Sequence, residues 1–90
     1  MAQWERYRRN PEVSWRTIEG QAVLVLNREG EIQVLNAVGT LVWEHIGEVP
    51  SAIAGRIASE YDVSPEEALE DVFAFLEEMR SAGTIVAAGG

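Results

Sequence analysis

The spacing of apolar residues predicts three short β-strands in the N-terminal part of the chain. Apolar and polar residues alternate over 13–18 and again over 32–35, as they do in half-buried strands. Residues 22–26 form a continuous apolar run with β-branched valines, which is typical of a buried strand. The turn residues at 27–30, Asn-Arg-Glu-Gly, join the second and third runs. Because strands joined by short connections are usually neighbours, the pattern predicts a three-stranded antiparallel meander.

The hydrophobic period changes at Asn36, within the stretch EIQVLNAVGTLVWEHI, from strand-like alternation to the spacing of a helix. The Asn36 side chain can accept from the free amides of a first helical turn, so we expect a short helix that stops at Gly47. Pro50 and Ser51 begin a second helix. Its apolar residues recur on one side, at Ile53, Ile57 and Tyr61.

A third and longer helix begins at residues 64–67, Ser-Pro-Glu-Glu. The serine is a cap, the proline suits the first helical position, and the second glutamate completes a capping box. We expect this helix to run to about Ala82, a length of about 27 Å, and to be closed by Gly83. Ile85-Val86 then packs back onto the body of the protein.

These elements predict an α+β fold, a winged-helix-like arrangement with a three-stranded antiparallel meander followed by three helices. The 90 residues suffice for one modest core. We expect a flexible N-terminal arm over 1–12, the folded domain over 13–86 and a C-terminal tail over 87–90. Trp4 and Tyr7 could hold the arm against the domain, or they could be exposed aromatics of a mobile terminus.

Composition and charge argue against several classes of function. The chain has no cysteine, no apolar run long enough for a membrane helix and no signal sequence, so we expect a soluble cytosolic protein without a membrane partner. The net charge is -8, and eight acidic residues lie between Arg56 and Arg80 without a basic residue among them. An acidic surface repels phosphate backbones, so nucleic-acid binding through the C-terminal half is disfavoured.

The sequence contains no set of residues that supports catalysis. His45 is the only histidine, and without cysteines or a second histidine it is best interpreted as a surface residue rather than a metal ligand. No glycine-rich phosphate loop and no Ser/His/Asp set with plausible spacing is found. We therefore expect no catalytic residue, no metal and no cofactor, and not an enzyme.

The third predicted strand is left with a free edge. A meander of order 1-2-3 gives strand 3 one neighbour, and the strand at 32–35 contains no proline, lysine or bulge-forming glycine that would block further pairing. Such an edge is what a guest peptide needs in order to add a strand. Backbone hydrogen bonds would supply affinity, and pockets for alternate side chains would supply selectivity.

The third helix has an apolar arc of about 160°, wider than a minimal core-facing stripe. Phe73 lies at one margin of the arc and Phe75 at the other, so one of them could line a groove beside the sheet. The alternative is that both are buried. The arc consists of Ala68, Leu69, Val72, Phe73, Phe75, Leu76 and Met79.

An ordered series of residues over 13–85 resembles the PqqD-like family, which is named after a pyrroloquinoline quinone (PQQ) biosynthesis protein. Its members are similar to one another in being non-catalytic recognition elements for ribosomally made, post-translationally modified peptides. The turn Asn-Arg-Glu-Gly-Glu lacks the Tyr-Pro-Glu of the quinone-pathway proteins, which favours a general peptide-recognition domain. The matching residues are Trp15-Arg16, Gly20, Leu35-Asn36, Trp43, Ile53, Ile57, Tyr61-Asp62-Val63, Asp71-Val72, Phe75-Leu76, Met79 and Gly83.

The resemblance implies that the leader segment of a precursor peptide joins the sheet beside the third strand and lies against the third helix. A partner such as a radical SAM enzyme or a peptidase would then modify the peptide. By the family match Phe75 is a core position, which nominates Phe73 with Leu69 for the groove, and Asp71 is the first acid to test for pairing with basic leader residues. The expected peptide-binding residues are Glu31, Ile32, Gln33, Val34, Leu35, Leu69, Asp71, Val72, Phe73 and Leu76.

Three alternatives remain open at this point. One is a winged-helix DNA-binding regulator, for which only the arginine-rich N-terminal segment offers phosphate contacts. Another is an accessory subunit that binds an enzyme without touching a leader peptide. An unpaired edge also permits a homodimer through the third strand.

Overall fold

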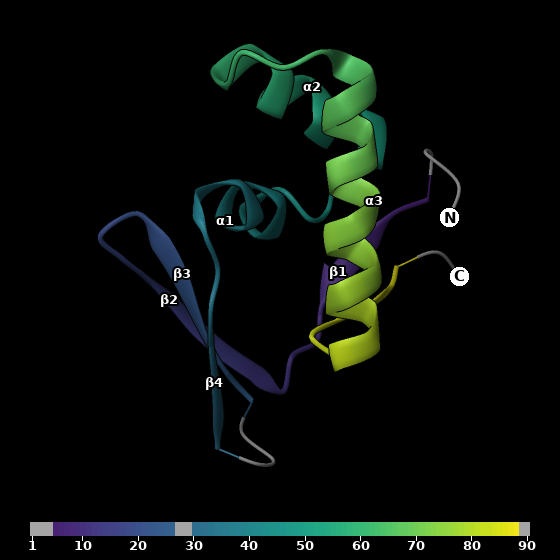
Figure 1. The fold of residues 1–90 in the computed structure, drawn as a ribbon. Coiled ribbons are helices and arrows are strands. Elements are labelled where there is room, and N and C mark those ends of the chain that lie inside the picture. The colour runs from purple at the N-terminus through teal and green to yellow at the C-terminus, as the bar shows by residue number, and fades with distance from the viewer. Residues whose placement is uncertain (1–4, 27–29, 89–90) are drawn as a thin grey trace.

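The computed structural model describes residues 5–26 and 30–88, and Figure 1 shows how its elements are arranged. A three-stranded sheet lies on one side, and helix α3 runs along the other side of the molecule with α1 between them. The predicted α+β, winged-helix-like order of a meander followed by three helices is confirmed. The elements are β1 (Tyr7–Arg9), β2 (Val13–Ile18), β3 (Gln21–Leu26), β4 (Glu31–Val34), α1 (Ala37–Glu44), α2 (Pro50–Glu60), α3 (Pro65–Ala82) and β5 (Ile85–Ala87).

The main sheet has the order β2-β3-β4, with both neighbouring pairs antiparallel. Leu24 is the central residue of its buried face, and it pairs with Trp15 of β2 and Gln33 of β4. The predicted turn before β4 lies outside the described residues except for Gly30, whose φ of 67° is the positive value that glycine adopts most easily.

A second sheet of two strands was not predicted. Strand β1 pairs antiparallel with β5, so that Tyr7 lies opposite Ala87 and Arg9 opposite Ile85. The Tyr7 side chain is only 4% exposed and belongs to the core. Residues 7–9 of the expected arm over 1–12 are therefore a strand packed on the domain, whereas Trp4 lies outside the described residues.

The predicted start of α1 and both predicted ends of α3 are confirmed by their hydrogen bonds, whereas α1 ends at Glu44 and not at the predicted Gly47. The Asn36 side chain accepts from the Gly39 amide at 2.8 Å, and the Ser64 hydroxyl accepts from the Glu67 amide at 3.2 Å. Helix α3 ends at Gly83, which has the left-handed conformation with φ of 79°. Each helix thus begins or ends where a local side-chain or glycine signal places it, except that α2 starts at Pro50 without a side-chain cap.

The core lies between the main sheet and the three helices, and Trp43 of α1 is fully buried at its centre. Arg9 of β1 reaches over this region: its guanidinium carbon lies 4.6 Å from the Trp15 ring centroid and 5.4 Å from that of Trp43. Arg9 Nη2 also donates to the backbone oxygens of Trp43 at 2.9 Å and Glu44 at 3.0 Å, at the C-terminal end of α1. Strand β1 therefore fixes the position of α1 against the sheet.

Helix α1 is also joined directly to the sheet. The Thr40 hydroxyl accepts from the Ala22 amide at 2.9 Å and donates to the Leu35 carbonyl at 3.3 Å. Thr40 is 4% exposed, so this buried hydroxyl holds the start of β3 and the end of β4 against the helix. No helix in the described part of the chain is long and apolar enough to cross a membrane.

Candidate functional site

The outer edge of β4 has no paired strand among the described residues. The Leu35 amide donates to the Ala22 carbonyl at 2.9 Å, toward β3. Because backbone groups alternate in direction along an antiparallel strand, the N–H and C=O groups of Ile32 and Val34 point away from β3. These groups face the free edge, where a further strand could bind them.

The side chains of β4 alternate between the two faces of the sheet. Gln33 lies opposite the buried Leu24, so Gln33 and Leu35 face the helices. Ile32 and Val34 face the opposite side and are 64% and 60% exposed. Of the predicted site residues on this strand, only Gln33 and Leu35 are therefore directed toward a groove beside the helices.

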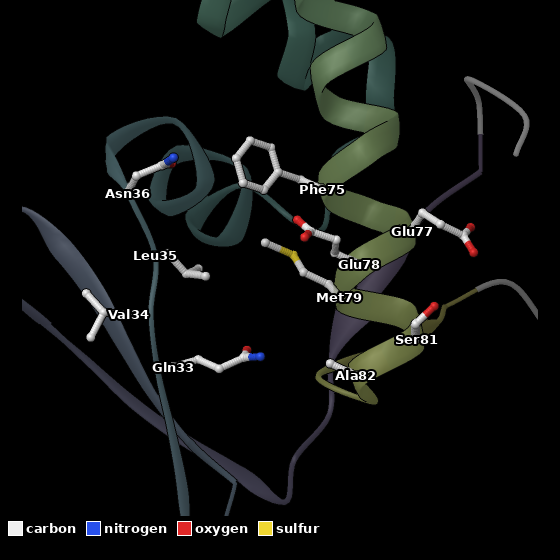
Figure 2. A pocket seen from close by; sticks show the side chains of 10 residues that line it. All are labelled: Gln33, Val34, Leu35, Asn36, Phe75, Glu77, Glu78, Met79, Ser81 and Ala82. Carbon is white, nitrogen blue, oxygen red and sulfur yellow. The ribbon is translucent and has the colours of Figure 1, made fainter.

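A groove of about 640 Å³ separates the edge of β4 from the C-terminal half of α3. In Figure 2 the side chains of Gln33 and Leu35 approach it from the strand, and those of Phe75, Glu78 and Met79 approach it from the helix. The groove has both apolar and polar walls. Its lining residues are Gln33, Val34, Leu35, Asn36, Phe75, Glu77, Glu78, Met79, Ser81 and Ala82.

The helical wall of the groove is one face of α3. Phe75, Glu78, Met79 and Ala82 follow one another at spacings of three, one and three residues, which places them on the same side of a helix. Figure 2 shows the Glu78 carboxylate directed toward β4, between Phe75 and Met79, whereas the Glu77 carboxylate points away. The Glu77 carboxylate instead binds Arg80 Nη2 at 3.0 Å.

Phe75 is held in the groove by its contact with α1. A Cβ atom added to Gly39 would lie 2.8 Å from Phe75 Cε1 and 3.2 Å from Asn36 Oδ1, closer than side-chain atoms can approach without a shift. Glycine at this position therefore allows the Phe75 ring to lie directly against the first turn of α1.

Several predicted groove residues on α3 do not lie in the groove. Val72 and Leu76 are fully buried in the core and do not line the groove, so their contact with a guest stays a prediction. Phe73 is partly buried against the core cluster, and Leu69 lines a separate depression between α2 and α3. Asp71 is exposed but does not line the groove. The prediction followed mainly the core-facing part of the apolar arc, whereas the side of α3 that faces β4 carries Phe75, Glu78, Met79 and Ala82.

Sequence reasoning missed seven of the ten lining residues, and four of them, Phe75, Glu78, Met79 and Ala82, form the helical wall. The apolar arc of α3 included Phe75 and Met79 but gave no indication of which margin faces the strand. The signal that could have resolved this is Gly39, because its missing side chain leaves room for a large group on α3. Glu78 and Ala82 carried no apolar signal at all, and only the three-dimensional arrangement reveals them.

A second, more open depression lies on the far side of α1 and α2 and carries the only histidine of the sequence. His45 Nδ1 is 3.1 Å from a Glu48 carboxylate oxygen, and Arg56 binds the same carboxylate at 2.8 Å. The hydrogen bond from Arg56 holds the pKa of Glu48 below its usual value. This cluster is internally paired, and the predicted interpretation of His45 as a surface residue matches its partly exposed position.

Comparison with known proteins identifies relatives of this fold. A solved structure described as TbiB1 in complex with the TbiA(beta) leader peptide is 25% identical, covers 92% of this chain and 96% of that chain, and has a TM-score of 0.80. Another, a lasso peptide synthetase B1 complexed with the leader peptide, is 28% identical, covers 90% of this chain and 98% of that chain, and has a TM-score of 0.83. No curated protein sequence matches the chain significantly.

The model of the family described as coenzyme PQQ synthesis protein D matches residues 21–85, from the first residue of β3 to the start of β5. The matched segment includes β4, the first turn of α1 and the whole of α3, which are the elements that form the groove. The family match and the two structural relatives agree with the resemblance seen in the sequence. The chain belongs to the PqqD family.

Proposed function

We propose that this protein is a non-catalytic module that binds the leader segment of a precursor peptide and presents the peptide to a separate modifying enzyme. The observation that carries this proposal is the unpaired edge of β4 beside the groove of α3. Two proteins of the same fold, at 25% and 28% identity, are described in complex with leader peptides. The leader would bind as a fourth strand of the main sheet.

The groove lies where an added strand would lie. Neighbouring strands lie about 4.8 Å apart, so a guest paired with β4 would occupy the space in front of α3. Its backbone would bind the free groups of Ile32 and Val34. Alternate guest side chains would point toward Phe75 and Met79, and the side chains between them would point to the exposed face of the sheet.

The modifying partner is a separate enzyme, such as a peptidase or a radical SAM enzyme. The likeness to a lasso peptide synthetase B1, together with the absence of the Tyr-Pro-Glu turn, favours a pathway of the lasso type over the quinone pathway. DNA binding is disfavoured because the exposed residues of α3 are mainly acidic, and its one arginine, Arg80, is paired with Glu77.

The test is to remove one edge N–H without removing a side chain that the core needs. Proline at Val34 has no N–H to donate to a guest, whereas the β3–β4 hydrogen bonds do not use that group. Peptides would be selected from a phage-displayed random library on the immobilised protein, and their affinities measured by fluorescence polarisation. Val34→Pro should weaken them about tenfold or more, and Val34→Ala, which keeps the N–H, should bind like the original protein.

Amide chemical shifts should place the bound peptide at β4 and at residues 75–82. Unfolding in urea should show that Val34→Pro loses less than about 1 kcal/mol, because the residue lies on an edge strand. If no peptide is selected, or if Val34→Pro binds the selected peptides normally, the proposed function is wrong. A failure to select peptides, combined with capture of a modifying enzyme, would support an accessory subunit instead. A homodimer through β4 would appear as a peptide-sensitive dimer in gel filtration.

A further inference from the structure

Glu78 differs from Glu77, the other acidic residue that lines the groove. The Glu77 carboxylate is bound by Arg80, but Glu78 has no hydrogen-bond or ion-pair partner anywhere in the described parts of the chain. In Figure 2 its carboxylate is directed toward β4, into the space that an added strand would occupy. It is therefore an unpaired negative charge facing the proposed guest.

The surroundings of Glu78 would strengthen an ion pair formed there. Phe75 and Met79 lie on either side of it along the helical wall, and Leu35 lies across the groove. A strand that fills the groove would exclude water from the carboxylate and leave it beside these apolar groups. A buried carboxylate without a partner is costly, so a guest that brings no positive charge would bind less tightly.

We propose that Glu78 determines the specificity of the groove by selecting a guest peptide with a basic residue at the position that faces it. This inference rests on the proposed function. Since every second residue of an added strand faces the same side, the neighbouring groove-facing positions lie two residues before and after the basic one. These positions lie against the apolar wall of Phe75, Met79 and Ala82. The favoured guest thus carries a lysine or arginine with an apolar residue two positions to one or both sides.

The experiment compares peptides selected by three forms of the full chain from the same phage-displayed random library. The original protein should enrich peptides with a basic residue two positions from an apolar one. Glu78→Lys should enrich an acidic residue at that position instead. Glu70→Lys is the matched control, since it makes the same charge change on an exposed part of α3 that does not line the groove. It should enrich the same peptides as the original protein.

Affinities give a second readout. A selected basic peptide should bind Glu78→Gln about fivefold more weakly and Glu78→Lys more weakly still, with little change for Glu70→Lys. The difference between the original protein and Glu78→Gln should shrink as salt is raised. Circular dichroism and urea unfolding would show that the variants are folded, which is expected because Glu78 is an exposed side chain.

The possible results separate this inference from the proposed function. If the selected peptides bind at β4 but show no basic residue, or if Glu78→Lys and Glu70→Lys select the same peptides, the role of Glu78 is overturned and strand addition stands. If peptides are not selected at all, or bind without contacting β4, strand addition itself is overturned and the role of Glu78 falls with it.

Discussion

Two strands of this protein, β5 and β4, each have an edge that could pair with another strand. One of these edges is paired within the described chain and the other is not. The edge of β5 is covered by β1, which adds the buried Tyr7 and the Arg9 side chain over Trp15 and Trp43. The edge of β4 is left without a paired strand in the described chain, although its neighbour α3 leaves a groove beside it. The N-terminal strand β1 therefore covers the edge of β5 and leaves the edge of β4 uncovered.

The contrast separates a stabilising edge from a binding edge. At β5, strand pairing is combined with burial of an aromatic side chain, so the N-terminal segment contributes to the core. At β4, the outward backbone groups and the exposed Ile32 and Val34 contribute little to the core, which leaves them free for a partner. Substitutions in β1 or β5 should thus affect the stability of the fold, and substitutions along the free edge of β4 should affect peptide binding.

The largest expected effect is the loss of the Tyr7 side chain. Tyr7→Ala should lower the free energy of unfolding by about 3 kcal/mol, because it leaves a cavity in the core next to β5. Urea unfolding followed by circular dichroism would measure this. Arg8→Ala, at the exposed neighbouring position, should change stability by less than about 0.5 kcal/mol. Equal effects of the two substitutions would show that β1 is not part of the core.

An intermediate effect is expected at alkaline pH on the same side of the molecule. Burial, and then the 2.7 Å hydrogen bond to Glu5, raises the pKa of Tyr7 to about 12. The unfolded chain loses this proton near pH 10, so between these values the unfolded state binds fewer protons and stability falls as the pH rises. The loss should reach about 2 kcal/mol near pH 12.

Tyr7→Phe isolates this contribution, because it keeps the ring and removes the ionisable hydroxyl. Its stability, measured by urea unfolding at a series of pH values above about 9, should fall less steeply than that of the original protein. The chain has no lysine, so no lysine side chain titrates in this pH range. Parallel curves for the two proteins would mean that Tyr7 ionises equally easily in the folded and unfolded states.

The smallest expected effect is that of Gly39→Ala. Because Gly39 lets the Phe75 ring lie against α1, this substitution should affect both stability and the groove. In an open helix, alanine in place of glycine would add about 1 kcal/mol of stability. Here the new Cβ would lie 2.8 Å from Phe75 Cε1, so Gly39→Ala should instead lower stability by about 1 kcal/mol and push the ring toward the guest.

Peptide affinity should fall about fivefold in Gly39→Ala, as measured by fluorescence polarisation with a library-selected peptide. Combining it with Phe75→Leu, which shortens the opposing side chain, should recover part of the lost stability. A gain in stability for Gly39→Ala alone would show that the Phe75 ring moves aside without cost, and that the ring is not held in place by α1.

The sequence predicted the elements that depend on neighbouring residues. Asn36, Ser64 and Gly83 each act within one helical turn, so the ends of α1 and α3 follow from the local chemistry. The meander likewise follows from two runs of alternating residues and one continuous apolar run. The free edge of β4 was predicted for the same reason, since its pairing partner is the strand that directly precedes it.

What the sequence did not show depends on residues far apart in the chain. The pairing of β1 with β5 joins the two ends of the domain, and three residues at Tyr7–Arg9 are too few to carry a period. The groove residues on α3 depend on how the helix is rotated relative to β4, and that rotation follows from its packing against α2, β5 and α1. A wide apolar arc does not determine this rotation. For that reason Phe73, and not Phe75, was predicted to line the groove.

The pairing of Tyr7 with Ala87 has a consequence for how the domain can be attached to other proteins. The chain enters and leaves the fold at adjacent backbone positions, on the side of the molecule away from the main sheet (Figure 1). A segment that continues from Tyr7 or from Ala87 would leave the fold from nearly the same point. Fusions at the N-terminal and C-terminal ends should therefore hold an attached enzyme at a similar distance from a captured peptide.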